Sequence, residues 1–217
     1  MRALALGLTL LLPTQAQPCD VALVLAIDVS GSIDAGEYRI QSTGTADALQ
    51  DRAVTEALLE GQVALTLLHW SGSGQQAVVL PWAQMQTPTD IAKAADHIRN
   101  APRAFSGSDT AVGQAIDAAL TLFPAAPACA RHIIDISGDG PENSGNTVRA
   151  ARSRAAAAGV TINAIAIEDV GQSTAITQFY RNWVITNGGF VITSRGLAAY
   201  PQAIRTKLLR ELEKPAS

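Results

Sequence analysis

A short segment near the start of the chain constrains its fold most strongly. The run from Val21 to Ile27 contains only Ala, Val, Leu and Ile, and Asp28-Val29-Ser30-Gly31-Ser32 follows it directly. An uncharged apolar run of this kind is typical of a strand buried on both faces. The turn after it offers one carboxylate and two hydroxyls, which are hard oxygen ligands. The segment therefore predicts a buried strand with a divalent-cation site at its carboxyl end.

The remaining sequence alternates between helical and strand patterns. Asp34-Ala-Gly-Glu37 is a capping box that begins a helix, which we expect to break near Asp51, restart and end at Gly61. Pro81 indicates an edge strand, because proline cannot donate to the ladder. Further strands are expected at 62–70, 77–82, 132–136, 160–167 and 190–193, and further helices at 88–100, 110–123, 146–158, 174–186 and 197–213.

Such alternation predicts an α/β fold with three layers. We expect a doubly wound, mostly parallel six-stranded sheet of order 3-2-1-4-5-6, with one antiparallel edge strand and helices on both faces. No linker or repeat divides the chain, so one domain is expected over residues 17–217. With 47 % hydrophobic residues and a net charge of -3, the chain can bury a large core and gives no reason to expect nucleic acid or an anionic membrane as partner.

Residues 1–16 have the pattern of a secretory signal peptide. Arg2 precedes the apolar run from Ala3 to Leu12, and small residues lead up to Ala16. The run is too short to span a bilayer. We expect cleavage after Ala16 and a mature protein that is periplasmic or secreted.

The two cysteines are relevant to the predicted export of the protein. An oxidising compartment permits a disulfide between Cys19 and Cys129, each of which lies close to the start of a predicted strand. If those strands are neighbours, both sulfurs lie at the edge of the sheet opposite the proposed metal end. The alternative is two unpaired thiols.

The pattern Asp28-x-Ser30-x-Ser32 after a buried strand resembles the metal-ion-dependent adhesion site (MIDAS) of von Willebrand factor type A (VWA) domains. That family carries a threonine at a helix start with a small residue three positions later, and Thr110 and Gly113 match this. It also carries Asp-Gly at the end of a later strand, matched by Asp139-Gly140. If the register is two residues off, Ser108 takes the place of Thr110. Either residue has an ordinary N-cap as its alternative role.

The likeness extends beyond the metal loops. The run from Ile136 to Pro141, the break at 49–51 and the ending at 203–212 are similar to DUF1194, a family of exported bacterial proteins in the VWA superfamily. Open α/β sheets bind ligands at the carboxyl ends of strands where the strand order reverses. All five proposed ligands map to that end. The sequence departs from the VWA pattern at Gly138, where threonine is usual.

The resemblance implies a divalent-cation-dependent protein-binding domain rather than an enzyme. Its metal would be Mg²⁺, or Mn²⁺ or Ca²⁺, and an open coordination position would accept a carboxylate from a partner protein. The ligands would be Asp28, Ser30, Ser32, Thr110 and Asp139. Residues Glu142, Asn143 and Asn146 of the next loop are candidates for hydrogen bonds to those ligands or to a partner.

Two other functions remain open, a metal-dependent hydrolase and a VWA-like module that binds no metal. Against the hydrolase, the chain has no Gly-x-Ser-x-Gly elbow, and His69, His97 and His132 are scattered. Asp135 interrupts an apolar strand, and a buried carboxylate needs a partner. It either orients a metal ligand or pairs with Arg131 or a helix cation at the rim of the sheet.

Overall fold

The protein is described from a computed structural model that covers residues 19–107, 109–145, 147–169, 171 and 174–213. The predicted signal peptide at residues 1–16 lies outside the described residues. The alternative ligand Ser108 and the loop residue Asn146 also lie outside them.

The described strands form one sheet in the order β3-β2-β1-β4-β5-β6. Neighbours pair in parallel except for β2 and β3, which are antiparallel and place β3 at one edge. This confirms the predicted strand order, the antiparallel edge strand and the α/β fold class. The strands are β1 (Cys19–Asp28), β2 (Ala64–Trp70), β3 (Gln76–Gln84), β4 (Cys129–Gly138), β5 (Val160–Glu168) and β6 (Val191–Arg195).

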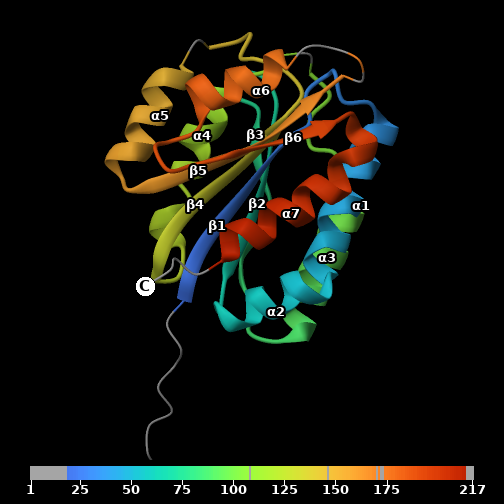
Figure 1. The fold of residues 1–217 in the computed structure, drawn as a ribbon, viewed down its shortest axis with the longest axis vertical. Helices are drawn as coiled ribbons and strands as arrows, with labels where there is room; N and C mark the ends of the chain where they lie inside the picture. Colours follow the sequence, from blue (N-terminus) through green and yellow to red (C-terminus); the bar gives the residue numbers. More distant parts are fainter. Residues whose placement is uncertain (1–18, 108, 146, 170, 172–173, 214–217) are drawn as a thin grey trace, which may run out of the picture.

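Helices cover both faces of the sheet, which gives three layers (Figure 1). One face is covered by α1 (Ala35–Gln50), α2 (Arg52–Glu60), α3 (Pro88–Asn100) and α7 (Tyr200–Leu212). The other face is covered by α4 (Val112–Leu120), α5 (Val148–Ala157) and α6 (Ala175–Phe179), together with a π-helix at Tyr180–Val184. Short 3₁₀ turns lie at Phe123–Ala125 and Leu197–Ala199.

The central strand β1 is buried on both sides, as its uncharged sequence predicts. Leu23 and Leu25 belong to the core cluster under α1 and α7, whereas Val24 and Ala26 belong to the cluster under α4 and α5. None of these four side chains is more than 1 % exposed. Because successive strand residues face opposite sides, the position after Ile27 directs Asp28 toward the α4 and α5 side.

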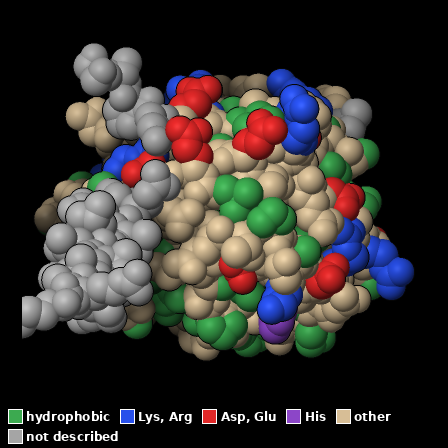
Figure 2. All heavy atoms as spheres, turned by 90° about the horizontal axis from the view of Figure 1, so that it is seen from below, with side chains coloured by type: hydrophobic (Ala, Val, Ile, Leu, Met, Phe, Trp, Pro, Cys, Tyr) green, Lys and Arg blue, Asp and Glu red, His purple; other side chains and the backbone are tan. Residues whose placement is uncertain are grey.

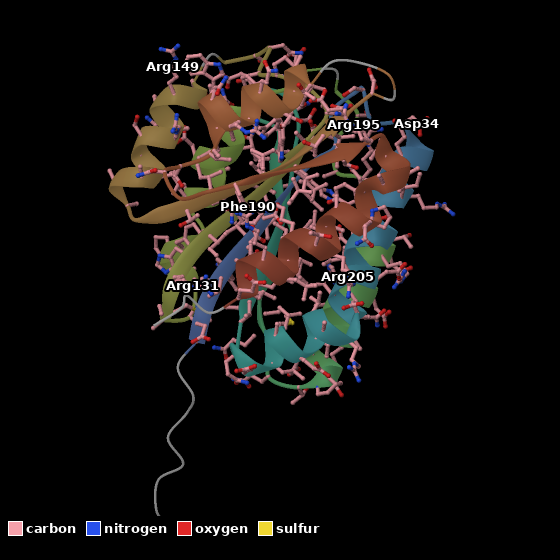
Figure 3. All side chains as sticks on the ribbon, viewed as in Figure 1. Asp34, Arg131, Arg149, Phe190, Arg195 and Arg205 are labelled. Atoms are coloured by element: carbon pink, nitrogen blue, oxygen red, sulfur yellow. A yellow bond between two sulfur atoms is a disulfide. The ribbon has the colours of Figure 1, made fainter. Side chains whose placement is uncertain are left out.

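The predicted break between the first two helices is confirmed at Asp51. Its side chain caps α2 by accepting from the backbone N–H groups of Ala53 and Val54, at 3.0 and 3.3 Å. Arg205 on α7 donates to the second carboxylate oxygen at 2.7 Å (Figure 3), so this corner is fixed to α7. At the start of α1 the predicted capping box between Asp34 and Glu37 is present.

The continuous α-helix predicted over residues 174–186 is wrong. The structure has the short helix α6 followed by π-helical geometry from Tyr180, where Ile185 N–H donates to Tyr180 O at 3.1 Å. A π turn inserts one residue into the helical repeat and so changes which side chains face the sheet. Tyr180 is fully buried as a result, while Trp183 is left 39 % exposed.

Cys19 and Cys129 lie at the end of the sheet opposite Asp28. They are direct neighbours in the pairing of β1 with β4 and form a disulfide with a Cα–Cα distance of 4.4 Å. Cys19 and Cys129 are the first residues of β1 and β4, rather than preceding those strands as predicted. Figure 2 shows this lower end of the molecule, where acidic and basic side chains are interspersed. No helix in the described part of the chain is long and apolar enough to cross a membrane.

Asp135 pairs with a lysine on a helix, as one of the two alternatives predicted, but the pair lies inside the protein rather than at the rim of the sheet. Lys207 on α7 reaches its carboxylate at 2.5 Å and also pairs with Glu211, and all three side chains are at most 2 % exposed. Asn163 donates to Glu211 at 2.8 Å, and the Phe190 ring lies 5.8 Å from the Lys207 ammonium (Figure 3). The predicted alternative of pairing with Arg131 is wrong, because that guanidinium donates to the backbone oxygen of Glu211.

Candidate metal centre

The site lies where β1 and β4 end side by side. Ile27 is the register partner of Ser137 in the parallel pairing of β1 with β4. Asp28 at the end of β1 and Asp139 just after β4 therefore lie at the same end of the sheet. Ser32 Oγ donates to Asp139 Oδ1 at 2.8 Å, and Ser30 Oγ lies 3.3 Å from Ser32 Oγ. Oxygen-bearing side chains from two distant segments therefore meet at this edge.

The loop after β1 is held in a defined conformation. Ser30 N–H donates to Asp28 Oδ1 at 2.8 Å, and Ile33 N–H donates to Ser30 O at 2.9 Å. Arg103, from the segment before the Thr110 loop, donates to Val29 O at 2.8 and 3.1 Å and to Ser30 O at 2.7 Å. Arg103 is not recognisable from the sequence, because a lone arginine in an irregular segment carries no pattern that indicates its contacts.

Thr110 lies on a third loop that is tied to the segment following Asp139. Thr110 N–H donates to Asn143 Oδ1 at 2.8 Å, and Asn143 N–H donates back to Thr110 O at 3.0 Å. Ala111 N–H donates to Ser71 O, which fixes the loop beside the end of β2. Thr110 is buried and does not cap α4, whose N-cap is Ala111 without a side-chain hydrogen bond. The structure thus places Thr110 at the same end of the sheet, and among the described residues no hydrogen bond joins its side chain to Ser30 or Asp139.

Glu142 and Gly113 explain how closely these two loops approach. Glu142 accepts from Gly113 N–H at 2.9 Å and from Val148 N–H at 3.1 Å, so it joins the starts of α4 and α5. A Cβ atom on residue 113 would lie 2.3 Å from Thr147 Oγ1, so only glycine fits there. The small residue and the polar loop after Asp139 therefore position Thr110.

The two carboxylates lie in a poorly solvated setting. The pKa of Asp28 is raised to about 7, mainly by burial and then by the charge of Asp139, and the hydrogen bonds from Ser30 oppose the rise. Burial also raises the pKa of Asp139, against the hydrogen bond from Ser32. Among the residues that the structure describes, no Lys, Arg or His forms an ion pair with either group. Asp28 Oδ2 is buried and has no hydrogen-bond partner in this described set.

These features fit a divalent cation held mainly by oxygen. A positive ion would relieve the unfavourable burial of both carboxylates. Asp28 Oδ2 would then bind the ion, either directly or through water. The described residues contain no group of three His, Cys, Asp or Glu side chains that could hold a metal. A cation at this end would therefore need hydroxyl oxygens as well as carboxylates, and the predicted pattern supplies them from serine and threonine.

The three histidines have contacts elsewhere. His69 packs edge-on against Tyr38 with ring centroids 5.4 Å apart, and burial lowers its pKa to about 4. His97 Nε2 contacts Val79 O at 2.8 Å, and the His132 ring stacks on Phe123. None of these contacts involves Ser30 or Asp28.

Comparison with known proteins supports the fold and the resemblance predicted from sequence. A family model described as "Protein of unknown function (DUF1194)" matches residues 18–216, which confirms the predicted likeness. No curated protein matches the chain in sequence.

Several solved structures share the fold. One is proximal thread matrix protein 1 from the mussel byssus "with zinc occupied MIDAS motif", which is 21 % identical with a TM-score of 0.65 over 91 % of this chain and 49 % of that one. The pilus adhesin SpaC of Lactobacillus rhamnosus GG is 12 % identical, with a TM-score of 0.67 over 91 % of this chain and 32 % of that one. The vWF domain of the pilus tip protein Mfa5 of Porphyromonas gingivalis is 13 % identical, with a TM-score of 0.61 over 93 % and 99 % of the two chains. The chain thus spans about half of the mussel protein and a third of SpaC.

Proposed function

This chain belongs to the DUF1194 family and has the fold of VWA domains, and on that premise we propose that it is an exported, divalent-cation-dependent protein-binding domain. The proposed ligands are Asp28, Ser30, Ser32, Thr110 and Asp139. One observation carries the proposal. Two carboxylates with raised pKa values meet serine hydroxyls at the end of the sheet, and neither has a cationic partner among the described residues.

The surrounding residues prepare the loops for a cation. Ser32 orients Asp139, Arg103 holds the backbone of the β1 loop, and Asn143 holds the backbone of Thr110. When bound, Mg²⁺ would supply a Lewis-acidic position to which a carboxylate of the partner protein can bind. Hydroxyl and carboxylate oxygens favour Mg²⁺, with Mn²⁺ or Ca²⁺ as alternatives, whereas zinc is named for the mussel protein.

Export is supported by independent features of the chain. The Cys19–Cys129 disulfide is typical of an oxidising compartment, and residues 1–16 have a signal-peptide pattern. A pilus adhesin and a byssal thread protein share the fold, in keeping with a role outside the cytoplasm. We therefore propose a periplasmic or secreted protein whose partner is another protein.

The proposal is tested by pulling down partners from the source organism's envelope fraction with Mg²⁺ or with EDTA. A partner retained by the parent in Mg²⁺, but lost in EDTA and with Asp28→Asn, supports it. Asp96→Asn, an exposed carboxylate on α3, is the matched control and retains the partner. Equal recovery with and without Mg²⁺ contradicts it. Turnover of ester or phosphoester substrates would favour the hydrolase instead, and the absence of any Mg²⁺ effect on melting would favour the metal-free module.

A further inference from the structure

Gly138, the last residue of β4, leaves a space beside Asp28 that another side chain fills. A Cβ atom on residue 138 would lie 2.2 Å from Tyr180 Oη, 3.0 Å from Asp28 Oδ2 and 3.3 Å from Trp70 Cζ2. The tyrosine hydroxyl and the unpartnered oxygen of Asp28 therefore lie around the same point. Any larger residue at position 138 would displace the Tyr180 hydroxyl.

The backbone places Tyr180 there through an irregular turn. Tyr180 begins the π-helix at Tyr180–Val184, and such turns are common at functional sites. Its ring is fully buried, and Phe179 packs against it edge-on with ring centroids 5.5 Å apart. The ring is thus held in position, with its hydroxyl at the end of β4.

The polar atoms around this point are complementary. Tyr180 Oη, Trp70 Nε1 and Asp28 Oδ2 are all buried, and none has a hydrogen-bond partner in the part of the chain that the structure describes. An unsatisfied buried polar group is unfavourable, so the presence of Tyr180 Oη and Asp28 Oδ2 around one point needs an explanation. Tyr180 and Trp70 can donate, whereas the carboxylate oxygen can only accept. No direct hydrogen bond joins Tyr180 Oη to Asp28 Oδ2 among the described residues, so one bridging water would satisfy both.

We propose that Tyr180 is a positioning residue for Asp28, its hydroxyl donating to one bridging water that in turn donates to Oδ2. Ser30 N–H already holds Oδ1 at 2.8 Å, so the tyrosine fixes the second oxygen and sets the plane of the carboxylate. Partners of this kind orient metal ligands, and their removal typically weakens metal binding about 10- to 100-fold. This inference rests on the proposed function, because it assumes that Asp28 serves a cation.

The test measures Mg²⁺ affinity by isothermal titration calorimetry and melting temperature in EDTA. Tyr180→Phe should weaken Mg²⁺ binding about tenfold while the protein remains folded in EDTA. Tyr200→Phe is the matched control, because Tyr200 is equally buried but packs in the core on the other face of the sheet. It should leave the Mg²⁺ affinity unchanged.

A matched pair of double variants separates the hydroxyl from the packing. Tyr180→Phe removes the atom that crowds position 138, so Gly138→Ser or Gly138→Ala can be added to it. The serine variant should bind Mg²⁺ more tightly than the alanine variant, since it returns a hydroxyl to the same space. Tyr180→Phe with the parent's Mg²⁺ affinity, or equal affinities for the two double variants, would overturn the inference. A parent protein that binds no Mg²⁺ at all would instead refute the proposed function.

Discussion

Replacing Asp28 by Asn should make the metal-free protein more stable at high pH. The pKa of Asp28 rises from 3.8 to about 7 on folding, mainly because the carboxylate is buried. A shift of this size corresponds to about 4 kcal/mol, at about 1.4 kcal/mol per pH unit. Since the native state holds the proton more tightly, the stability from this group is complete below pH 4 and is lost as the pH rises to about 7.

The variant removes this titration while keeping the size of the side chain. In EDTA at pH 8, Asp28→Asn should exceed the parent by up to about 4 kcal/mol, or about 10 °C in melting temperature, and the difference should vanish near pH 4. Adding Mg²⁺ at pH 8 should stabilise the parent, by about 2.7 kcal/mol at 100 times Kd, and leave the variant unchanged. The assay is urea unfolding between pH 4 and 8, in EDTA and in Mg²⁺.

Two controls define the result. Burial also raises the pKa of Glu211 to about 7, but this group titrates in both proteins and cancels in their difference. Asp96→Asn removes an exposed carboxylate and should follow the parent throughout. Parallel pH profiles of Asp28→Asn and the parent in EDTA, or stabilisation of the variant by Mg²⁺, would contradict this prediction.

Two further predictions concern parts of the fold away from the site. Lys207→Met should cost about 3–5 kcal/mol at pH 8, because it leaves Asp135 and Glu211 buried without their cation. The loss should be smaller at pH 5, since burial raises the pKa of both carboxyl groups; an equal loss in urea unfolding at the two pH values would contradict this. Replacing Cys19 and Cys129 together by Ala should lower the free energy of unfolding by about 2–5 kcal/mol, because the disulfide closes a loop of 110 residues. A double variant that unfolds at the parent's urea concentration would show that the bond adds no stability.

The features predicted correctly are those that depend on local pattern. The apolar run of β1 and the turn after it are contiguous, so burial on both faces and the position of Asp28 could be inferred directly. The doubly wound sheet follows from the alternation of elements and the handedness of crossover connections, although these alone allow more than one strand order. The meeting of Ser32 with Asp139 then follows from the parallel pairing of β1 with β4.

The features missed depend on contacts between distant segments. In α7, Leu209 is only partly buried, whereas the charged residues Lys207 and Glu211 are buried. Their burial is favourable only because Asp135 lies opposite on β4, and neither segment alone indicates that pairing. The position of Tyr180 likewise depends on a π turn and on the missing side chain at Gly138.

The proposed cation site is tested most directly by anomalous diffraction from crystals soaked in Mn²⁺. We expect one peak at the carboxyl ends of β1 and β4, within coordinating distance of the Ser30, Ser32 and Thr110 hydroxyls, and none in crystals of Asp28→Asn. Two results would contradict the proposal. One is a parent crystal without a peak at this position, and the other is a structure in which Thr110 and Asp139 lie too far apart to bind one ion.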